Sequence, residues 1–316
     1  MRDIDDILNE VKYVYETYGI KTIRFEHDIF TMDKNRLRLF CNKLIKSGLP
    51  IAWRCSSRID TVDEEMIHLM KKAGLRSIFF GIETGSERMQ SIIHKGLSID
   101  KTKSILKSCI EAGVGVTASF MYGFPQETEA DISDTLNLIC DLLDMGIQRV
   151  QAHLVDFLQG TELFNEYKNQ LVFDGSVSNI ATQFGVAECS FIQEHLDIFS
   201  AFFNYPSELR FVLDKVEDFI RCYMKFRNSM RQMRILMNGN AMEMYKAFRE
   251  TVNEVNCRES EDNENSGRLR ICKGYDFNKV DIKTVIEFYS RFEDRNVKQV
   301  FATFAEEVSN VGGNMP

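Results

Sequence analysis

The chain has 316 residues, of which 44% are hydrophobic, enough to form one large folded domain or two ordinary ones. Acidic side chains outnumber basic ones by 47 to 39, so a general role in binding nucleic acid or an anionic membrane is not expected. No run approaches the roughly 20 apolar residues that cross a bilayer. The acidic amino terminus is also unlike a signal peptide, which predicts a cytoplasmic protein.

Helices and strands alternate through the first half of the chain. Apolar periodicity predicts helices at 3–18, 33–47, 63–73, 99–112 and 128–144. Apolar runs predict strands at 21–25, 51–55, 77–82, 114–121 and 147–154. Each strand follows a helix after a short loop, which indicates right-handed β-α-β crossovers in a parallel sheet. The expected fold class is therefore α/β.

Polar residues follow each of these strands, as they do at the mouth of a (β/α) barrel. This arrangement favours an incomplete TIM-like (β/α)6 barrel over a doubly wound sheet. The series begins on a helix, so we expect the first strand and its loop to be missing from a truncated sequence.

The pattern changes after residue 167. The organisation predicted is a partial barrel over 1–167 and an α-helical accessory or substrate domain over 168–316. Helices are expected at 208–237, 241–255, 281–292 and 296–308. A charged stretch without aliphatic residues predicts a flexible linker near 257–268.

The eight cysteines are scattered, at positions 41, 55, 109, 140, 189, 222, 257 and 272. No pair has the C-x-x-C or C-x-x-x-C spacing of a zinc knuckle or cluster loop, so the sequence predicts no metal ligands in this chain. Cys109 and Cys140 are expected to be small core residues on helices.

Four segments occur in an order that resembles the radical S-adenosylmethionine (SAM) superfamily, in particular its cobalamin-binding branch. They are FEHDIFT (25–31), RCSSRID with GIETGSERMQSIIHKGL (54–97), ASFMYGFPQET (118–128) and FLQGTELFNEY (157–167). The resemblance covers about residues 1–167, although Gln159 stands where proline is usual. It implies a SAM-dependent enzyme of the TIM-barrel type.

The resemblance also implies a [4Fe-4S] cluster that cleaves SAM reductively to a 5′-deoxyadenosyl radical. The family's C-x-x-x-C-x-x-C loop follows the first barrel strand, the element expected to be missing here. Cys41 and Cys55 do not replace it, because Cys41 is expected within a helix on the outside of the barrel and Cys55 stands alone near a strand end. The resemblance allows cobalamin as a further cofactor of a full-length parent protein.

The resemblance assigns residues at the strand ends to SAM. Glu83 follows a buried strand and would accept hydrogen bonds from the ligand, or else caps a helix. Arg58 and Arg54 would clamp the carboxylate, although Arg58 would equally suit an ion pair with Asp60 or Asp63.

Three further positions complete the predicted SAM site. Lys95 stands where related enzymes carry a basic residue that faces SAM, with a solvated lysine as the alternative. Ser119 matches a polar position that reaches the ribose, with a buried serine bonded to backbone as the alternative. Asp28 stands where the superfamily places groups near the SAM ammonium, and His27 is a weaker candidate.

Three hypotheses remain open from the sequence. The first is a radical SAM enzyme fragment that modifies a small molecule or peptide. The second is a non-catalytic barrel that binds SAM or a protein partner. The third uses a basic helical stretch of the second half to bind a peptide or RNA, against an ordinary amphipathic helix with a solvated face. Its basic residues are Arg221, Lys225, Arg227, Arg231 and Arg234.

Overall fold

A computed structural model describes residues 2–26, 29–173, 189–261, 282–292 and 297–312. The chain divides into two compact units, and each is considered by itself. One comprises residues 1–120 with 141–151, and the other comprises residues 121–140 with 152–316.

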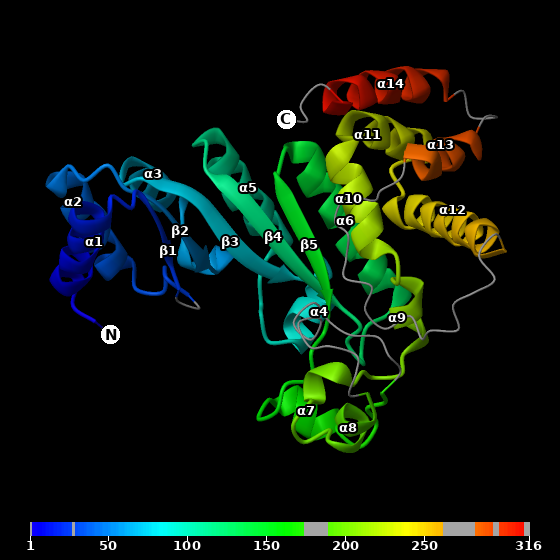
Figure 1. The fold of residues 1–316 in the computed structure, drawn as a ribbon, viewed down its shortest axis with the longest axis horizontal. Helices are drawn as coiled ribbons and strands as arrows, with labels where there is room; N and C mark the ends of the chain where they lie inside the picture. Colours follow the sequence, from blue (N-terminus) through cyan, green and yellow to red (C-terminus); the bar gives the residue numbers. More distant parts are fainter. Residues whose placement is uncertain (1, 27–28, 174–188, 262–281, 293–296, 313–316) are drawn as a thin grey trace. The chain divides into compact units, whose positions relative to one another are not determined.

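A five-stranded sheet runs through the first half of the chain, in the order β1-β2-β3-β4-β5 (Figure 1). The strands are β1 (Thr22–Phe25), β2 (Ala52–Ser57), β3 (Leu75–Glu83), β4 (Gly115–Tyr122) and β5 (Arg149–Leu154). Neighbouring strands from β1 to β4 pair in parallel. All five predicted strands and the α/β class are confirmed, and the sheet of the described residues is open rather than closed into a barrel.

Helices separate the strands as predicted. They are α1 (Ile4–Tyr18), α2 (Lys34–Ser47), α3 (Glu64–Lys72), α4 (Glu87–Ile92), α5 (Ile99–Glu111) and α6 (Glu129–Met145). Aspartate or serine side chains accept a backbone hydrogen bond in the first turn of the first five helices. These N-caps satisfy amide groups that have no partner inside the helix.

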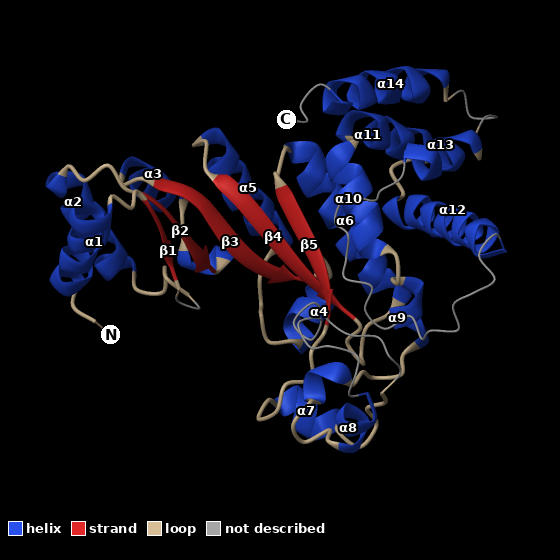
Figure 2. Ribbon diagram, in the orientation of Figure 1, coloured by secondary structure: helices blue, strands red, loops and turns tan. Residues whose placement is uncertain are grey.

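One face of the sheet is covered by helices, with α3 packed on β3 and flanked by α2 and α5 (Figure 2). Along β2 and β3 the side chains alternate, and Trp53, Cys55, Ile78 and Phe80 are buried on this helix-covered face. The Trp53 ring packs edge-on to Phe40, and its Nε1 donates to the Ala73 carbonyl at 2.8 Å. The helix-covered face is therefore the hydrophobic core of the first unit.

The second half of the chain is helical, as predicted, but its helices are more broken than expected. They are α7 (Glu162–Tyr167), α8 (Cys189–Glu194), α9 (Glu208–Val212), α10 (Val216–Lys225), α11 (Arg227–Leu236), α12 (Ala241–Glu261), α13 (Ile282–Ser290) and α14 (Lys298–Gly312). Residues 257–261 of the predicted linker form the end of α12, and 262–268 lie outside the described residues. The predicted domain boundary at residue 167 stays a prediction.

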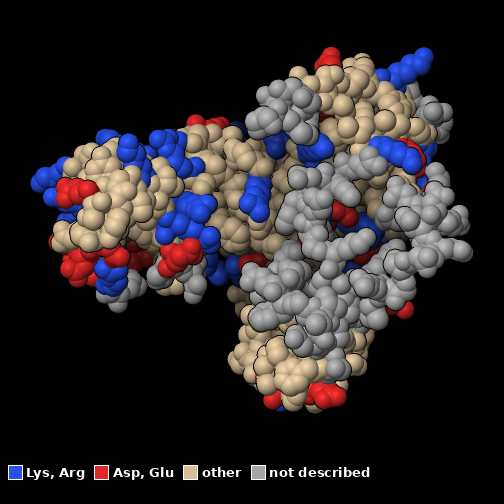
Figure 3. Space-filling model, viewed as in Figure 1, with Lys and Arg blue, Asp and Glu red and all other residues tan. Residues whose placement is uncertain are grey.

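On the face drawn in Figure 3, acidic and basic side chains intermix over the amino-terminal helices. In the basic stretch, Arg221 pairs with Asp218 at 2.6 Å, and Arg234 donates to the Gly239 carbonyl. Both of these cations therefore hold local structure, as in an ordinary amphipathic helix. Among the described residues, no helix is long and apolar enough to cross a membrane.

Glu307 on α14 caps the amino terminus of α11. Its carboxylate accepts from the backbone amides of Asn228 and Ser229, and from the Ser229 hydroxyl at 2.6 Å. We expect Glu307→Ala to lower the free energy of unfolding by about 1–2 kcal/mol, because two backbone amides lose their acceptor and the Ser229 hydroxyl keeps only the Phe226 carbonyl as an acceptor. Urea unfolding followed by circular dichroism measures this. Glu306→Ala, one residue earlier on the same helix, is the control, and an equal loss in both variants would contradict the cap.

Candidate functional site

The second face of the sheet carries polar and half-exposed side chains. It is formed by the residues that alternate with the core: Arg54 and Ser56 on β2, Ser77, Phe79, Gly81 and Glu83 on β3, and Thr117 and Ser119 on β4. We call it the open face. In parallel sheets ligands bind outside the carboxyl ends of the strands, so the carboxyl end of β3 is a candidate ligand site.

Glu83 ends β3 in a conformation that is rare for a residue with a side chain. Its φ is +69°, and the Thr84 amide donates to the Ile82 carbonyl across it. This is a γ-turn of the strained form with positive φ. The register between β3 and β4 also shifts at this point. Such strain persists only where surrounding contacts hold it, and it concentrates at functional sites.

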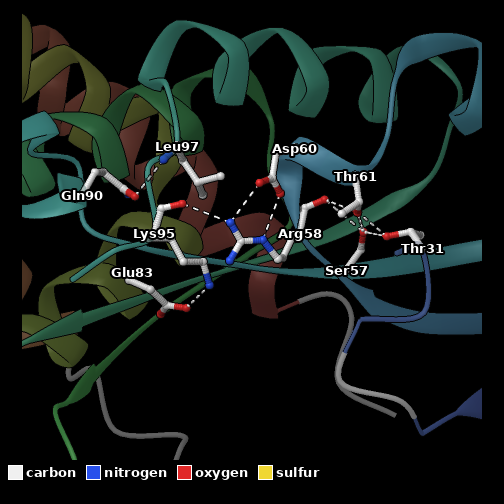
Figure 4. Close-up of polar contacts among 9 residues, drawn as sticks. All are labelled: Thr31, Ser57, Arg58, Asp60, Thr61, Glu83, Gln90, Lys95 and Leu97. Atoms are coloured by element: carbon white, nitrogen blue, oxygen red, sulfur yellow. Dashed lines mark hydrogen bonds and ion pairs between the residues drawn. The ribbon is translucent and has the colours of Figure 1, made fainter. Parts of the chain in front are cut away.

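Lys95 lies on the loop between α4 and α5 and forms an ion pair with Glu83 (Figure 4). The Lys95 Nζ is 2.8 Å from the Glu83 Oε1, and each side chain is 19% exposed. The pair lies directly over Gly81, because a Cβ added there would be 2.5 Å from the Glu83 oxygen and 3.2 Å from the Lys95 nitrogen. Position 81 must therefore lack a side chain for the pair to lie on the sheet.

Arg58 follows β2 and is paired with Asp60. Its Nε and Nη2 donate to the two Asp60 oxygens at 3.0 and 2.9 Å, and this hydrogen bonding lowers the pKa of the Asp60 carboxyl. Nη2 also donates to the Lys95 carbonyl at 3.0 Å. The sequence allowed an ion pair of this arginine with Asp60 or with Asp63, and the pair with Asp60 is present. Asp63 instead caps α3 and binds Lys34.

The remaining predicted SAM residues differ in where they lie. Ser119 is 5% exposed on β4, opposite Gly81 in the strand register, and so lies next to the strand position that underlies the ion pair. Arg54 is exposed on β2 of the same face, further from the strand end. Asp28 and His27 lie outside the described residues. The structure thus brings Glu83, Lys95 and Arg58 together, with Ser119 on the neighbouring strand.

Two groups of residues at this site were not singled out from the sequence. Gln90 on α4 is 1% exposed and bridges the end of β3 to the Lys95 loop. Thr31, Ser57 and Thr61 form a cluster of hydroxyls that reaches the Arg58 carbonyl. Neither glutamine nor scattered threonines carry a sequence signal, because their partners are backbone groups and residues distant in the chain.

The second unit contains the GFPQET segment. Gly123, with φ of +89°, donates its amide to the Glu127 carboxylate at 2.7 Å, and Glu127 is 6% exposed. A Cβ at Gly123 would be 2.8 Å from the Leu154 Cδ1, so this turn also requires glycine. The segment is therefore a tight, internally bonded turn, as its glycine and proline suggest.

The family's [4Fe-4S] cluster can be tested against the thiols. Among the described residues no three histidine, cysteine or acidic side chains come together as a metal site. Cys41, Cys55 and Cys109 are buried, and burial raises the pKa of each thiol to about 12. A cluster needs thiolates on one accessible loop. The thiols of the described residues therefore do not fit a cluster. Cys109 and Cys140 are core residues on helices, as predicted.

Burial raises the pKa of the Cys55 thiol from 9.0 to about 12. The thiol therefore stays protonated in the folded chain at pH values where it ionises in the unfolded chain. Its contribution to the free energy of unfolding is complete below pH 9 and is lost as the pH rises toward 12. The free energy of unfolding should fall between pH 7.5 and pH 10 in both proteins. We expect the fall to be about 1 kcal/mol smaller in Cys55→Ala than in the unmodified chain. Urea unfolding at the two pH values measures this. Parallel losses in both proteins would contradict a buried thiol that resists ionisation.

Comparison with known proteins identifies a family for the first part of the chain. The family model described as the radical SAM superfamily matches residues 1–139. Residues 1–139 belong to the radical SAM superfamily. An uncharacterized methyltransferase of Pyrococcus horikoshii is 32% identical over 133 residues, which are 42% of this chain and 29% of that protein. Cytidylyl-2-hydroxyethylphosphonate methyltransferase of Streptomyces wedmorensis is 29% identical over 39% of this chain and 23% of its own length.

The chain spans less than a third of the length of these two curated relatives. Among solved structures, the apo form of OxsB, a cobalamin-dependent SAM radical enzyme, has a TM-score of 0.52 and 13% identity. The similarity covers 98% of this chain and 53% of that one. At this identity the similarity concerns the fold, and it extends through the helical second half.

Proposed function

We propose that this chain binds SAM on its open face, as the SAM-binding part of a radical SAM enzyme. The observation that carries the proposal is the Glu83–Lys95 ion pair, held over Gly81 on a strained turn at the end of β3. The superfamily membership of residues 1–139 supplies the ligand class. The pair supplies a carboxylate and an ammonium at the sheet edge where ligands bind.

The charges of the pair are complementary to those of the amino-acid end of SAM. SAM carries an ammonium and a carboxylate there, so Glu83 would accept from its ammonium and Lys95 would donate to its carboxylate. The protein pair opens as the ligand enters, and each charge exchanges one partner for another. The desolvation cost is thereby limited, because neither charge is left alone in a partly buried site.

Ser119 and the arginines have separate roles in this proposal. Ser119, opposite Gly81, offers a hydroxyl to the ribose. Arg58 is paired with Asp60 and holds the Lys95 backbone, so it supports the site through that contact. Arg54 and Asp28 stay candidates for the ligand carboxylate and ammonium. When bound in a radical SAM enzyme, SAM is the source of a 5′-deoxyadenosyl radical.

The relatives do not fix the reaction or the substrate. Their names include methyltransferases, a methylthiotransferase and an anaerobic magnesium-protoporphyrin IX monomethyl ester cyclase. These are different reactions, so the proposal for this chain extends to SAM and not to a transferred group. A small-molecule or peptide substrate, and cobalamin as a second cofactor of a longer protein, remain proposals.

Isothermal titration of the purified chain tests SAM binding. We expect SAM to bind at least about tenfold more tightly than 5′-methylthioadenosine, which keeps the nucleoside but lacks the amino-acid end. That ratio reports the contacts of Glu83 and Lys95. Equal affinities, or no heat with either ligand, would contradict the proposal.

The non-catalytic alternative is separated by a second experiment. The chain is reconstituted anaerobically with iron and sulfide, reduced with dithionite and mixed with SAM. SAM binding without 5′-deoxyadenosine supports a SAM-binding part that does not act alone, and it agrees with the buried thiols. Cluster absorbance with release of 5′-deoxyadenosine would show that the chain is a complete catalyst and overturn the assignment of no cluster ligands.

A further inference from the structure

Gln90 lies on α4, between Glu83 and Lys95 in the sequence. It is 1% exposed, and its Nε2 donates to the backbone at the end of β3. Figure 4 shows its amide oxygen directed at the Leu97 amide. A buried glutamine amide has two donors and one acceptor oxygen, all of which need partners. Each partner of the Gln90 side-chain amide belongs to the backbone near Glu83 or Lys95.

The amide nitrogen of Gln90 holds the strained turn at Glu83. Its Nε2 donates to the Ile82 carbonyl at 2.7 Å and to the Thr84 carbonyl at 2.8 Å, the residues immediately before and after Glu83. Two hydrogen bonds from one amide thus hold the peptide group that precedes Glu83 and the one that follows Thr84, on either side of the turn with positive φ. They stabilise a backbone conformation that disfavours a side-chain-bearing residue.

The oxygen atoms of Gln90 hold the loop that carries Lys95. Its Oε1 accepts from the Leu97 amide at 3.2 Å, and its backbone carbonyl accepts from the amides of Lys95 and Gly96 at 3.0 Å each. The same residue therefore binds the backbone on both sides of the ion pair. Arg58, through the Lys95 carbonyl, is the further contact on this loop.

We propose that Gln90 is a positioning residue for the SAM site: it sets the Glu83 carboxylate and the Lys95 ammonium at the separation the ligand requires. The inference rests on the proposed function, because the site it positions is the proposed SAM site. Leucine at position 90 has a similar volume and no polar atoms, so it would remove the two amide bonds at β3 and the bond to Leu97. The helix would remain, and the loop and the turn would lose their common support.

A double-mutant cycle in SAM affinity tests this role. The four proteins are the unmodified chain, Gln90→Leu, Lys95→Met and the double variant, each titrated well below its unfolding temperature. If Gln90 positions the ion pair, each single change weakens SAM binding by about tenfold, and the double variant loses clearly less than the roughly hundredfold that independent losses would give. Multiplying losses, or unchanged affinity in Gln90→Leu, would overturn the proposal.

Trp53→Phe is the matched control for stability. Trp53 is fully buried on the helix-covered face, and the change removes one buried hydrogen bond to the Ala73 carbonyl. We expect a lower unfolding midpoint with unchanged SAM affinity. If the control loses affinity as Gln90→Leu does, general loosening explains both and the positioning role is overturned.

A ligand-free measurement separates this inference from the proposed function. Without SAM, acylation of Lys95 by sulfosuccinimidyl acetate is followed by peptide mass spectrometry. Release of Lys95 from Glu83 should raise its rate by about threefold or more in Gln90→Leu, and not in Trp53→Phe. If the unmodified chain binds no SAM, the proposed function is wrong, but the acylation rates still test whether Gln90 positions Lys95. Equal acylation rates in the unmodified chain and Gln90→Leu would overturn that role.

Discussion

Replacing Gly81 with alanine should weaken SAM binding by about tenfold and change the free energy of unfolding by less than about 0.5 kcal/mol. The new methyl group would stand 2.5 Å from the Glu83 Oε1 and 3.2 Å from the Lys95 Nζ. Both atoms are ends of flexible side chains, so they move aside at little cost to the fold. The ion pair is displaced from the open face, and the ligand loses its two aligned partners.

Gly115→Ala is the control for this prediction. Gly115 lies on the open face at the amino-terminal end of β4, and its added methyl would meet the Arg76 carbonyl oxygen at 3.3 Å. We expect a small change in stability and an unchanged affinity for SAM. Calorimetric titration and urea unfolding of both variants give the two quantities. A large loss of stability in Gly81→Ala, or full affinity, would contradict the placement of the pair over Gly81.

Removing the charge of Glu83 should have the largest effect on the site. In Glu83→Gln the side chain keeps its size but loses the negative charge that would meet the SAM ammonium. A partly buried charged hydrogen bond is worth roughly 1.5–3 kcal/mol, so we expect a loss of about ten- to hundredfold in SAM affinity. Glu64→Gln, a neutralisation on the exposed surface of α3, should leave the affinity unchanged. Equal affinity in all three proteins would exclude Glu83 from the site.

A glycine at position 83 separates the roles of backbone and side chain. Glycine adopts φ of +69° without strain, and the strain removed is worth roughly 1 kcal/mol, which offsets the lost ion pair. We therefore expect Glu83→Gly to lose SAM affinity as Glu83→Gln does, without loss of unfolding free energy. A clearly destabilised glycine variant would show that the carboxylate is there for the fold instead.

Much of the fold was predictable because its signals are local. Apolar runs bounded by glycines placed all five strands, and the structure confirms them with ends that differ by at most two residues. The helical second half was predicted less well. One or two helices were expected over 208–237, where α9, α10 and α11 are separate, since breaks at Leu213 and Phe226 follow from tertiary packing rather than from glycine or proline.

The candidate site was predictable in its residue types but not in its geometry. Glu83 and Arg58 were expected near strand ends, and Lys95 at a position where related enzymes carry a basic residue. The structure brings the three residues together, and their role toward SAM stays a prediction. The positive φ of Glu83 was not foreseen, because such conformations are ordinarily taken by glycine. Nor was Gln90, whose partners are backbone groups that only the folded chain assembles. The choice of Asp60 over Asp63 by Arg58 likewise depends on the turn after β2.

The central claim is that SAM binds at the carboxyl end of β3 on the open face. Hydrogen–deuterium exchange of the 316-residue chain, with and without saturating SAM, tests it most directly. We predict slower exchange in the peptides that cover residues 81–97, where the turn at Glu83 and the Lys95 loop lie, and weaker slowing around Ser119. Slowing confined to residues 189–261, or no slowing at 81–97 under saturation, would contradict it.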